Sequence, residues 1–159
     1  MKFRMVDLGR DYPGRITDFA QARNSFLEGL PDNEYVLFVE SDEEVPRMLL
    51  DYVAKLKPQY PYYNIRRINL LDNRFVPLWN PGFVAKLCSN KVRFVRGVHE
   101  IAMPRTPCGW IDIPTIHNQM STDSPYPVKV PGWYSTRLYR LLYVLFKLRD
   151  ILRGRDWSF

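Results

Sequence analysis

The sequence is poor in the features that cross-link a fold or carry it through a membrane. It has two cysteines in 159 residues, Cys88 and Cys108, which are too few for a disulfide framework and have no metal-binding spacing. No apolar run approaches the roughly 18 residues of a membrane-spanning helix. The first residues also lack the apolar stretch of a signal peptide. We therefore expect a cytoplasmic protein with reduced thiols and an ordinary hydrophobic core.

Histidine is equally scarce, and basic charge is unevenly placed. Only His99 and His117 are present, and the net charge is +6. Most of the excess positive charge follows Trp133. A basic body would suggest nucleic acid, whereas a basic terminal segment suggests an anionic surface or another partner. We expect no nucleic-acid binding, because a cluster of carboxylates within the first half would repel phosphates unless it held a metal ion.

Hydrophobic patterning predicts an α/β domain over residues 1–118. Strands and helices alternate in its first part, which favours a parallel sheet that binds ligands at the carboxyl ends of its strands. A richer set of strands follows. The expected strands are 2–8, 35–39, 62–70, 83–88, 92–95 and 110–113, and the expected helices run from Thr17 or Asp18 to about Leu30 and from Pro46 to about Leu56.

Two further segments follow this domain. Residues 119–132 form a proline-rich linker, and residues 133–159 contain a basic amphipathic helix and tail, with leucines at three- and four-residue steps up to Leu152. Aromatic residues near the helix start and basic residues along it suit a membrane interface. We expect peripheral contact with the inner face of a membrane, or a homodimer, through 133–152. Packing of this helix onto its own domain is the alternative.

Glu40-Ser41-Asp42-Glu43 directly follows the apolar run 35–39. Glu40 and Asp42 are two positions apart, so they point the same way if the strand continues. Clustered carboxylates repel one another, and Mg²⁺ or Mn²⁺ held by one or two carboxylates plus substrate phosphates would relieve that repulsion. The alternative is a solvated loop whose acidic residues precede a helix.

Three ordered blocks of sequence resemble family 2 glycosyltransferases, in particular the branch that includes lipopolysaccharide-core enzymes. The first block, from Asp18 to Asn24, fits D-F-x-x-x-R-N. The second, from Tyr35 to Glu43, is similar to an apolar strand ending in D-A-D-E. The third, Lys86 to Glu100, resembles R-L-F-R followed by G-x-V-H-E. The blocks together span residues 18–100.

The resemblance implies a GT-A-like fold, a Rossmann-like mixed sheet flanked by helices. It also implies a nucleotide-sugar donor, a saccharide, lipid-linked or protein acceptor, and Mn²⁺ or Mg²⁺. By position, Glu40 and Asp42 match the metal-binding D-x-D pair. The residues assigned to donor or cofactor binding are Asp18, Arg23 and Asp42, with Asp18 holding the helix start. His117 is a candidate third metal ligand. Glu100 and His99 match V-H-E, with Glu100 as the acceptor-side base or as a partner that orients His99 or Arg96.

Two departures from the family pattern bear on function. Glu40 replaces the first Asp of the pair, and nothing matches the P-x-Y-N strand or the D-x-x-S-x-D segment that usually open the family. The chain is therefore expected to be a minimal, truncated or split version of the fold. We expect a metal-dependent glycosyltransferase. The alternatives are a non-catalytic protein that binds a nucleotide sugar or a partner, and a metal-dependent hydrolase on the same residues.

Overall fold

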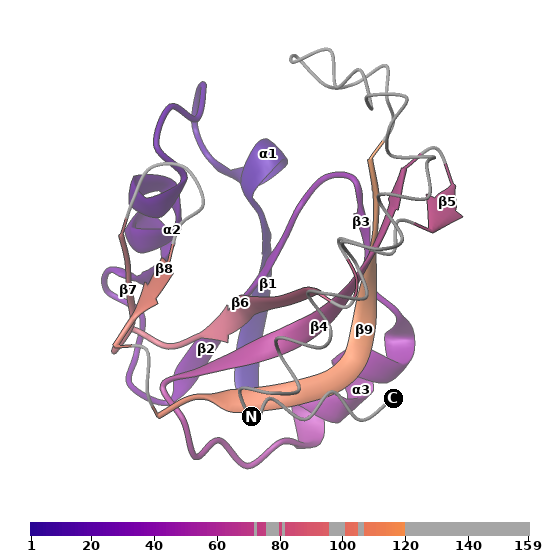
Figure 1. The fold of residues 1–159 in the computed structure, drawn as a ribbon. Coiled ribbons are helices and arrows are strands. Elements are labelled where there is room, and N and C mark those ends of the chain that lie inside the picture. Colours follow the sequence, from indigo (N-terminus) through magenta and orange to yellow (C-terminus); the bar gives the residue numbers. More distant parts are fainter. Residues whose placement is uncertain (72, 76–79, 81, 96–100, 105–106, 120–159) are drawn as a thin grey trace, which may run out of the picture.

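A computed structural model describes residues 1–71, 73–75, 80, 82–95, 101–104 and 107–119 (Figure 1). Within these residues the chain is a mixed α/β protein, with a curled mixed sheet flanked by few helices. The helices are α1 (Leu8–Asp11), α2 (Phe19–Leu27) and α3 (Arg47–Lys55). The strands are β1 (Lys2–Asp7), β2 (Glu34–Val39), β3 (Glu43–Glu44), β4 (Tyr62–Leu71), β5 (Arg74–Phe75), β6 (Gly82–Cys88), β7 (Arg93–Val95), β8 (Ile101–Met103) and β9 (Gly109–Gln119).

The main sheet has the strand order β1-β2-β6-β4-β9-β3, with β5 paired to β4, and β7 and β8 form a separate pair. Only β1–β2 and β4–β9 are parallel, and the other neighbours are antiparallel. The expected parallel sheet is thus limited to two pairs. The reason is that β6 lies between β2 and β4 and runs antiparallel to both. Antiparallel neighbours can be joined by a short connection, whereas parallel neighbours need a longer crossover.

Strand β2 lies at the centre of the core because its side chains are buried on both faces of the sheet. Val36 and Phe38 pack in a cluster with α2, β7 and β8. Tyr35, Leu37 and Val39 alternate to the other face and pack with Leu49 and Val53 of α3. The continuous apolar run predicted as a buried strand is therefore confirmed. Because both faces of β2 are covered, the strand is held in place. The residues after Val39 therefore leave the core at a defined position.

The start of α2 is set by Asp18, as the sequence predicts. Its Oδ1 accepts a hydrogen bond of 2.9 Å from the backbone N–H of Gln21, which satisfies a donor in the first turn. The helix ends at Leu27, and Gly29 then adopts a left-handed φ of 72°. The Asn24 side chain both donates to and accepts from the backbone of Phe94 in β7. These hydrogen bonds attach the small β7–β8 sheet to α2.

Two irregularities in strand pairing shape the sheet. Tyr63 pairs with Leu87 and Asn64 with Ala85, so Lys86 is an extra residue that bulges from β6. Ile65 pairs with Ile111 and Arg67 with Thr115, so β9 has extra residues around Pro114, which has no N–H to donate. Figure 1 shows β9 bending strongly along its length. Each irregularity changes the direction in which nearby side chains point.

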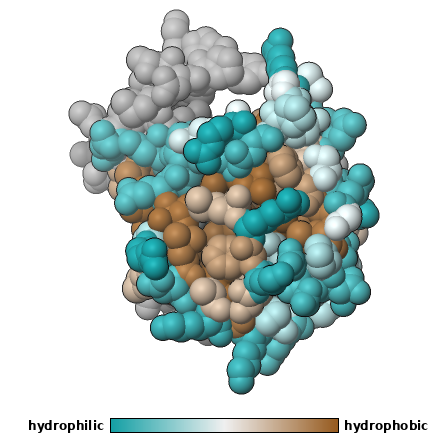
Figure 2. Space-filling model, turned by 180° about the vertical axis from the view of Figure 1, so that it is seen from behind, coloured by the Kyte–Doolittle hydropathy of each residue, from teal (hydrophilic) through white to brown (hydrophobic). Residues whose placement is uncertain are grey.

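The surface behind the view of Figure 1 is apolar across its middle, with hydrophilic residues around that area (Figure 2). Among the described residues, no helix is long and apolar enough to cross a membrane. The predicted helix at 133–152 lies outside the described residues. The predicted linker also lies outside them, apart from Gln119, which is the last residue of β9. The membrane and homodimer roles of that helix remain predictions.

Candidate metal centre

The acidic segment after β2 forms a tight turn that β9 holds in place. The backbone N–H of Glu43 donates to the carbonyl of Glu40 at 2.9 Å, which closes the turn. The backbone N–H of Asn118 donates to the carbonyl of Asp42 at 3.1 Å. Glu43 then pairs with His117 across the β3–β9 ladder. The last described strand therefore brings His117 beside the carboxylates of the turn.

Contacts with the end of β1 hold the same turn from its other side. The Ser41 hydroxyl donates to Oδ1 of Asp7 at 3.0 Å, and the backbone N–H of Gly9 donates to the same oxygen at 3.0 Å. A Cβ on residue 9 would lie 2.3 Å from the Ser41 Oγ. Glycine at this position thus permits the close approach of the turn to α1.

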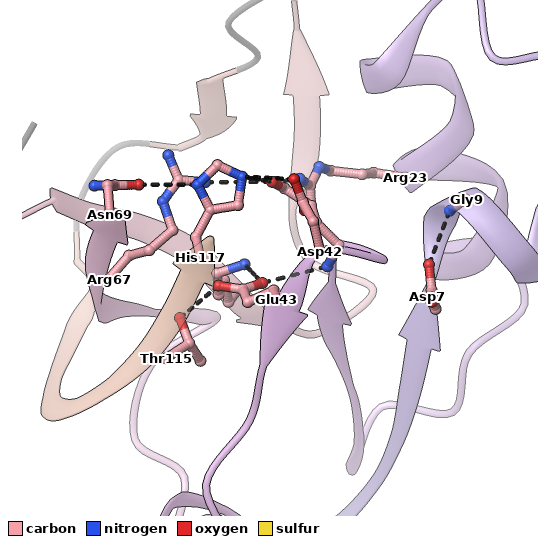
Figure 3. Close-up of polar contacts among 11 residues, drawn as sticks. Asp7, Gly9, Arg23, Asp42, Glu43, Arg67, Asn69, Thr115 and His117 are labelled. Atoms are coloured by element: carbon pink, nitrogen blue, oxygen red, sulfur yellow. Dashed lines mark hydrogen bonds and ion pairs between the residues drawn. The ribbon is translucent and has the colours of Figure 1, made fainter. Parts of the chain in front are cut away.

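Glu40, Asp42 and His117 form a cluster whose ligand atoms all lie within 4.8 Å of one another. Figure 3 shows the His117 ring facing the Asp42 carboxylate. The His117 Nε2 is 3.2 Å from Oδ2 of Asp42 and 3.5 Å from Oε2 of Glu40. One nitrogen and two carboxylates therefore converge on one point at the carboxyl end of β2. This set of side chains could hold a metal ion.

Asn69 fixes the orientation of the His117 ring. The His117 Nδ1 is 3.2 Å from Oδ1 of Asn69, and because an amide oxygen only accepts, Nδ1 carries the hydrogen. Nε2 then faces the two carboxylates, so a cation is needed between the three groups: either a proton on Nε2, which donates to Asp42, or a metal ion. An orienting partner on the second ring nitrogen is typical of histidines that bind metals.

Two arginines hold the Glu40 carboxylate. The Arg23 Nη2 is 3.6 Å from Oε1, and the Arg67 Nη1 is 3.4 Å from Oε2. Burial by itself would raise the pKa of Glu40, but the positive charges around it, chiefly those of Lys86 and Arg67, lower the pKa below its ordinary value. Glu40 is therefore an ionised carboxylate at neutral pH.

Asp42 is also held in its charged form. The hydrogen bond with His117 lowers the pKa of Asp42, and this effect outweighs the opposing effect of partial burial. Both carboxylates of the cluster are therefore anionic over the physiological range.

A buried ion pair lies beneath the cluster. The Lys86 ammonium contacts Oε2 of Glu43, and neither side chain has any solvent exposure. The Thr115 hydroxyl donates to Oε1 of Glu43, and the backbone N–H of Glu40 donates to Oε2 at 3.3 Å. Burial lowers the pKa of Lys86, against the opposing effect of the Glu43 and Glu40 charges. Because its oxygens are engaged in this way, Glu43 supports the turn and is not available as a metal ligand.

The sequence-predicted residues fall into four groups. Glu40, Asp42 and His117 meet in one cluster, and Asp18 holds the start of α2. Arg23 contacts Glu40 of the cluster, and its side chain is 2% exposed, with its guanidinium 5.0 Å and 5.3 Å from the ring centres of Phe38 and Phe94. Its predicted contact with a nucleotide stays a prediction. Glu100 and His99, the predicted catalytic pair, lie outside the described residues.

Four residues of the site were not expected from the sequence: Arg67, Asn69, Lys86 and Thr115. Side chains alternate between the two faces of β4, so the sequence indicates that Arg67 and Asn69 share a face. They pair with Thr115 and His117 of β9. Lys86 opens the third block of the resemblance, but that block does not indicate that its side chain is buried against Glu43.

Comparison with known proteins adds no assignment to this geometry. No protein-family model matches the chain, and no curated protein matches it significantly. Its function is therefore inferred from the site and from the sequence motifs alone.

Proposed function

We propose that this chain is a GT-A-like, metal-dependent glycosyltransferase that moves a sugar from a nucleotide-sugar donor to an acceptor hydroxyl. The observation that carries the proposal is the convergence of Glu40, Asp42 and His117 at the carboxyl end of β2. Open α/β sheets bind ligands at such strand ends. The resemblance to family 2 enzymes covers this strand and the segments on both sides of it.

The donor set fits a divalent cation. Two ionised carboxylates and one imidazole are available, and the second ring nitrogen of His117 is occupied by Asn69. Oxygen ligands suit both Mg²⁺ and Mn²⁺, whereas an imidazole nitrogen is more usual around a transition metal. Of the two ions that the sequence implies, the residues present favour Mn²⁺.

The chain's own residues prepare the site for a diphosphate leaving group. A bound divalent ion would neutralise the charge that develops on that group. Lys86 and Arg67 chiefly keep Glu40 ionised, and Arg23 and Arg67 contact its two oxygens. Asn69 orients His117. The buried pair of Lys86 and Glu43 fixes the turn that carries Asp42. Deprotonation of the acceptor hydroxyl by Glu100 also belongs to the proposal. Glu100 lies outside the described part of the chain.

Metal binding tests the site directly. Isothermal titration with Mn²⁺ should show one site in the wild-type protein, and Asp42→Asn and His117→Ala should each abolish it. Asp112→Asn is the matched control, because Asp112 is an exposed carboxylate whose partner is Arg66. Equal binding in all four proteins would overturn the metal assignment.

Donor turnover tests the chemistry. Release of a nucleoside diphosphate from a panel of nucleotide sugars should require Mn²⁺ and should fall at least about 100-fold in Asp42→Asn, as expected when a group that stabilises developing charge is lost. A protein that binds Mn²⁺ but neither binds nor cleaves any donor at millimolar concentration would overturn the transferase proposal.

A specific observation favours a second candidate, a non-catalytic protein that binds a nucleotide sugar or a partner. Arg23, Arg67 and Lys86 face the carboxylates of Glu40, Asp42 and Glu43, so three cations balance three anions. The charges of such a cluster balance without a metal ion, and a proton on Nε2 of His117 can bridge to Asp42 in its place. Binding of a nucleotide sugar without turnover, unchanged by removal of metal, would favour this candidate.

A further inference from the structure

One oxygen of Glu40 faces two different partners. Oε2 is 3.4 Å from Nη1 of Arg67 and 3.5 Å from Nε2 of His117. The other oxygen, Oε1, faces Arg23 at 3.6 Å. A metal ion that His117, Asp42 and Glu40 bind jointly has to use the Glu40 oxygen that faces His117. That oxygen is the one that Arg67 contacts.

A divalent ion and a guanidinium on the same carboxylate oxygen repel each other. At such short range the repulsion is large in a partly buried site, where water screens charges poorly. Arg23 cannot move away, because it is buried between Phe38 and Phe94. Arg67 can, because its side chain is 23% exposed. Metal binding is therefore expected to release Arg67 from Glu40.

Arg67 has hydrogen-bonding capacity to spare. A guanidinium carries five N–H donors, yet among the described residues the polar contact of Arg67 is a single long one to Glu40. A planar guanidinium matches the oxygens of a phosphate group, often through two parallel hydrogen bonds. Released from Glu40, Arg67 is a ready phosphate ligand at the edge of the metal cluster.

The charge of the whole cluster points to the same ligand. Three cations balance three carboxylates before metal binds. A divalent ion therefore leaves an excess of two positive charges in a partly buried site, and a diphosphate group supplies the compensating negative charge. A metal ion alone therefore leaves the charge of this site unbalanced.

We propose that Arg67 switches from Glu40 to a phosphate of the bound diphosphate when metal binds, so that metal and diphosphate bind cooperatively. The proposal rests on the proposed function, since it takes the Glu40–Asp42–His117 cluster as the metal site. By linkage, whatever factor the metal adds to diphosphate affinity, the diphosphate adds to metal affinity. Arg67 is the residue through which this coupling acts.

The test uses two titrations in which Arg67→Gln has effects of opposite sign. With Mn²⁺ alone, Arg67→Gln should bind several-fold more tightly than wild type, because the competing guanidinium is gone. With Mn²⁺ held saturating and uridine diphosphate as titrant, the same variant should bind about 10-fold more weakly or worse, because a charge-assisted hydrogen bond is lost. Inorganic pyrophosphate as titrant should show a similar loss if the phosphates, and not the base, are recognised.

Arg66→Gln is the matched control. Arg66 is the next residue on β4 and its Nη1 contacts Asp112 at 3.1 Å, away from the cluster. Its substitution should change neither titration. A variant that was merely misfolded would lose affinity in both titrations, so the opposite signs distinguish a switch from damage.

The outcomes separate this inference from the proposed function. If wild type binds Mn²⁺ through Asp42 but Arg67→Gln matches it in both titrations, the switch is overturned and the metal site stands. If Arg67→Gln weakens both, Arg67 is a structural support and the switch is likewise overturned. If neither protein binds Mn²⁺, the proposed metal-dependent function fails along with the switch.

Discussion

The Lys86 ammonium and the Glu43 carboxylate form an ion pair in which both side chains are fully buried, directly under the turn that carries Asp42. Burying two charges is costly, and an ion pair of this kind is stable only when further hydrogen bonds satisfy its remaining atoms. Thr115 and the backbone N–H of Glu40 supply such bonds. The pair therefore ties the geometry of the Glu40–Asp42–His117 cluster to the stability of the fold.

Breaking this pair should strongly destabilise the protein. Lys86→Met leaves the Glu43 charge buried without its main partner, and we expect a loss of about 3–5 kcal/mol in the free energy of unfolding. The double variant Lys86→Met/Glu43→Gln should lose less than Lys86→Met alone, because it leaves no buried charge behind. Urea denaturation monitored by circular dichroism measures both.

The exposed pair of Arg47 and Asp51, separated by 3.0 Å on α3, is the control for that experiment. Its removal by Asp51→Ala should cost less than about 0.5 kcal/mol, as is typical of surface pairs one helical turn apart. Equal losses in Lys86→Met and Asp51→Ala would contradict a structural role for the buried pair.

The cluster should make the fold sensitive to acid. The pKa values of Glu40 and Asp42 lie below their ordinary values of 4.5 and 3.8, so the folded state binds their protons less readily than the unfolded state does. Their stabilising contribution is complete above those ordinary values and is lost as the pH falls through the lowered pKa values. Unfolding free energies between pH 6 and pH 3 should fall less steeply in Glu40→Gln than in wild type. Parallel curves would show that Glu40 is not held ionised by its neighbours.

Asn69 should tune metal affinity without binding the metal. Asn69→Leu removes the acceptor that orients His117, and loss of such an orienting partner typically weakens metal binding by about 10–100-fold. Mn²⁺ added at about 100 times its dissociation constant should raise the stability of wild type by about 2.7 kcal/mol. The gain should shrink in Asn69→Leu, vanish in His117→Ala and be reversed by a chelator. A full stabilisation of Asn69→Leu by the same metal concentration would refute the orienting role.

Gly109 should not tolerate a side chain. A Cβ there would lie 2.2 Å from the ring of Tyr63 and 2.9 Å from that of Tyr60. The Tyr63 ring is fixed, because it is buried and its hydroxyl accepts a hydrogen bond from the backbone N–H of Gln59. Gly109→Ala should therefore cost about 1–3 kcal/mol, the range for overpacked cores, and would lower the thermal midpoint. Gly29→Asn is the control, since that site is open and asparagine accepts its positive φ.

The elements with strong local signals were predictable from the sequence. The run from Tyr35 to Val39 is apolar without alternation, and it is buried on both faces. Asp18 precedes an amphipathic stretch and caps it, while Pro46 precedes α3. Each of these features depends on neighbours in the chain. Their positions were therefore predictable to within a few residues at each end.

The layout of the sheet and half of the site were not predictable, because they depend on contacts between distant strands. The bulge at Lys86 and the irregularity before Thr115 arise from how β6 and β9 pair with β4. Lysine is usually a surface residue, and its place in the core depends on Glu43, a partner from a distant strand. The grouping of Glu40, Asp42 and His117 was anticipated from the family resemblance, whereas the roles of Arg67 and Asn69 follow from strand register.

The placement of β9 has a consequence for how the protein is made. Among the described strands, β3 pairs only with β9, and Glu43 is 72 residues from Thr115. Contacts between such distant segments form late, since a long loop must close before they stabilise anything. A chain emerging from the ribosome exposes its N-terminal segments first. It therefore carries Glu43 and Lys86 as unshielded charges until β9 follows, so the Glu40–Asp42–His117 cluster is completed only after residues 109–119 have been synthesised.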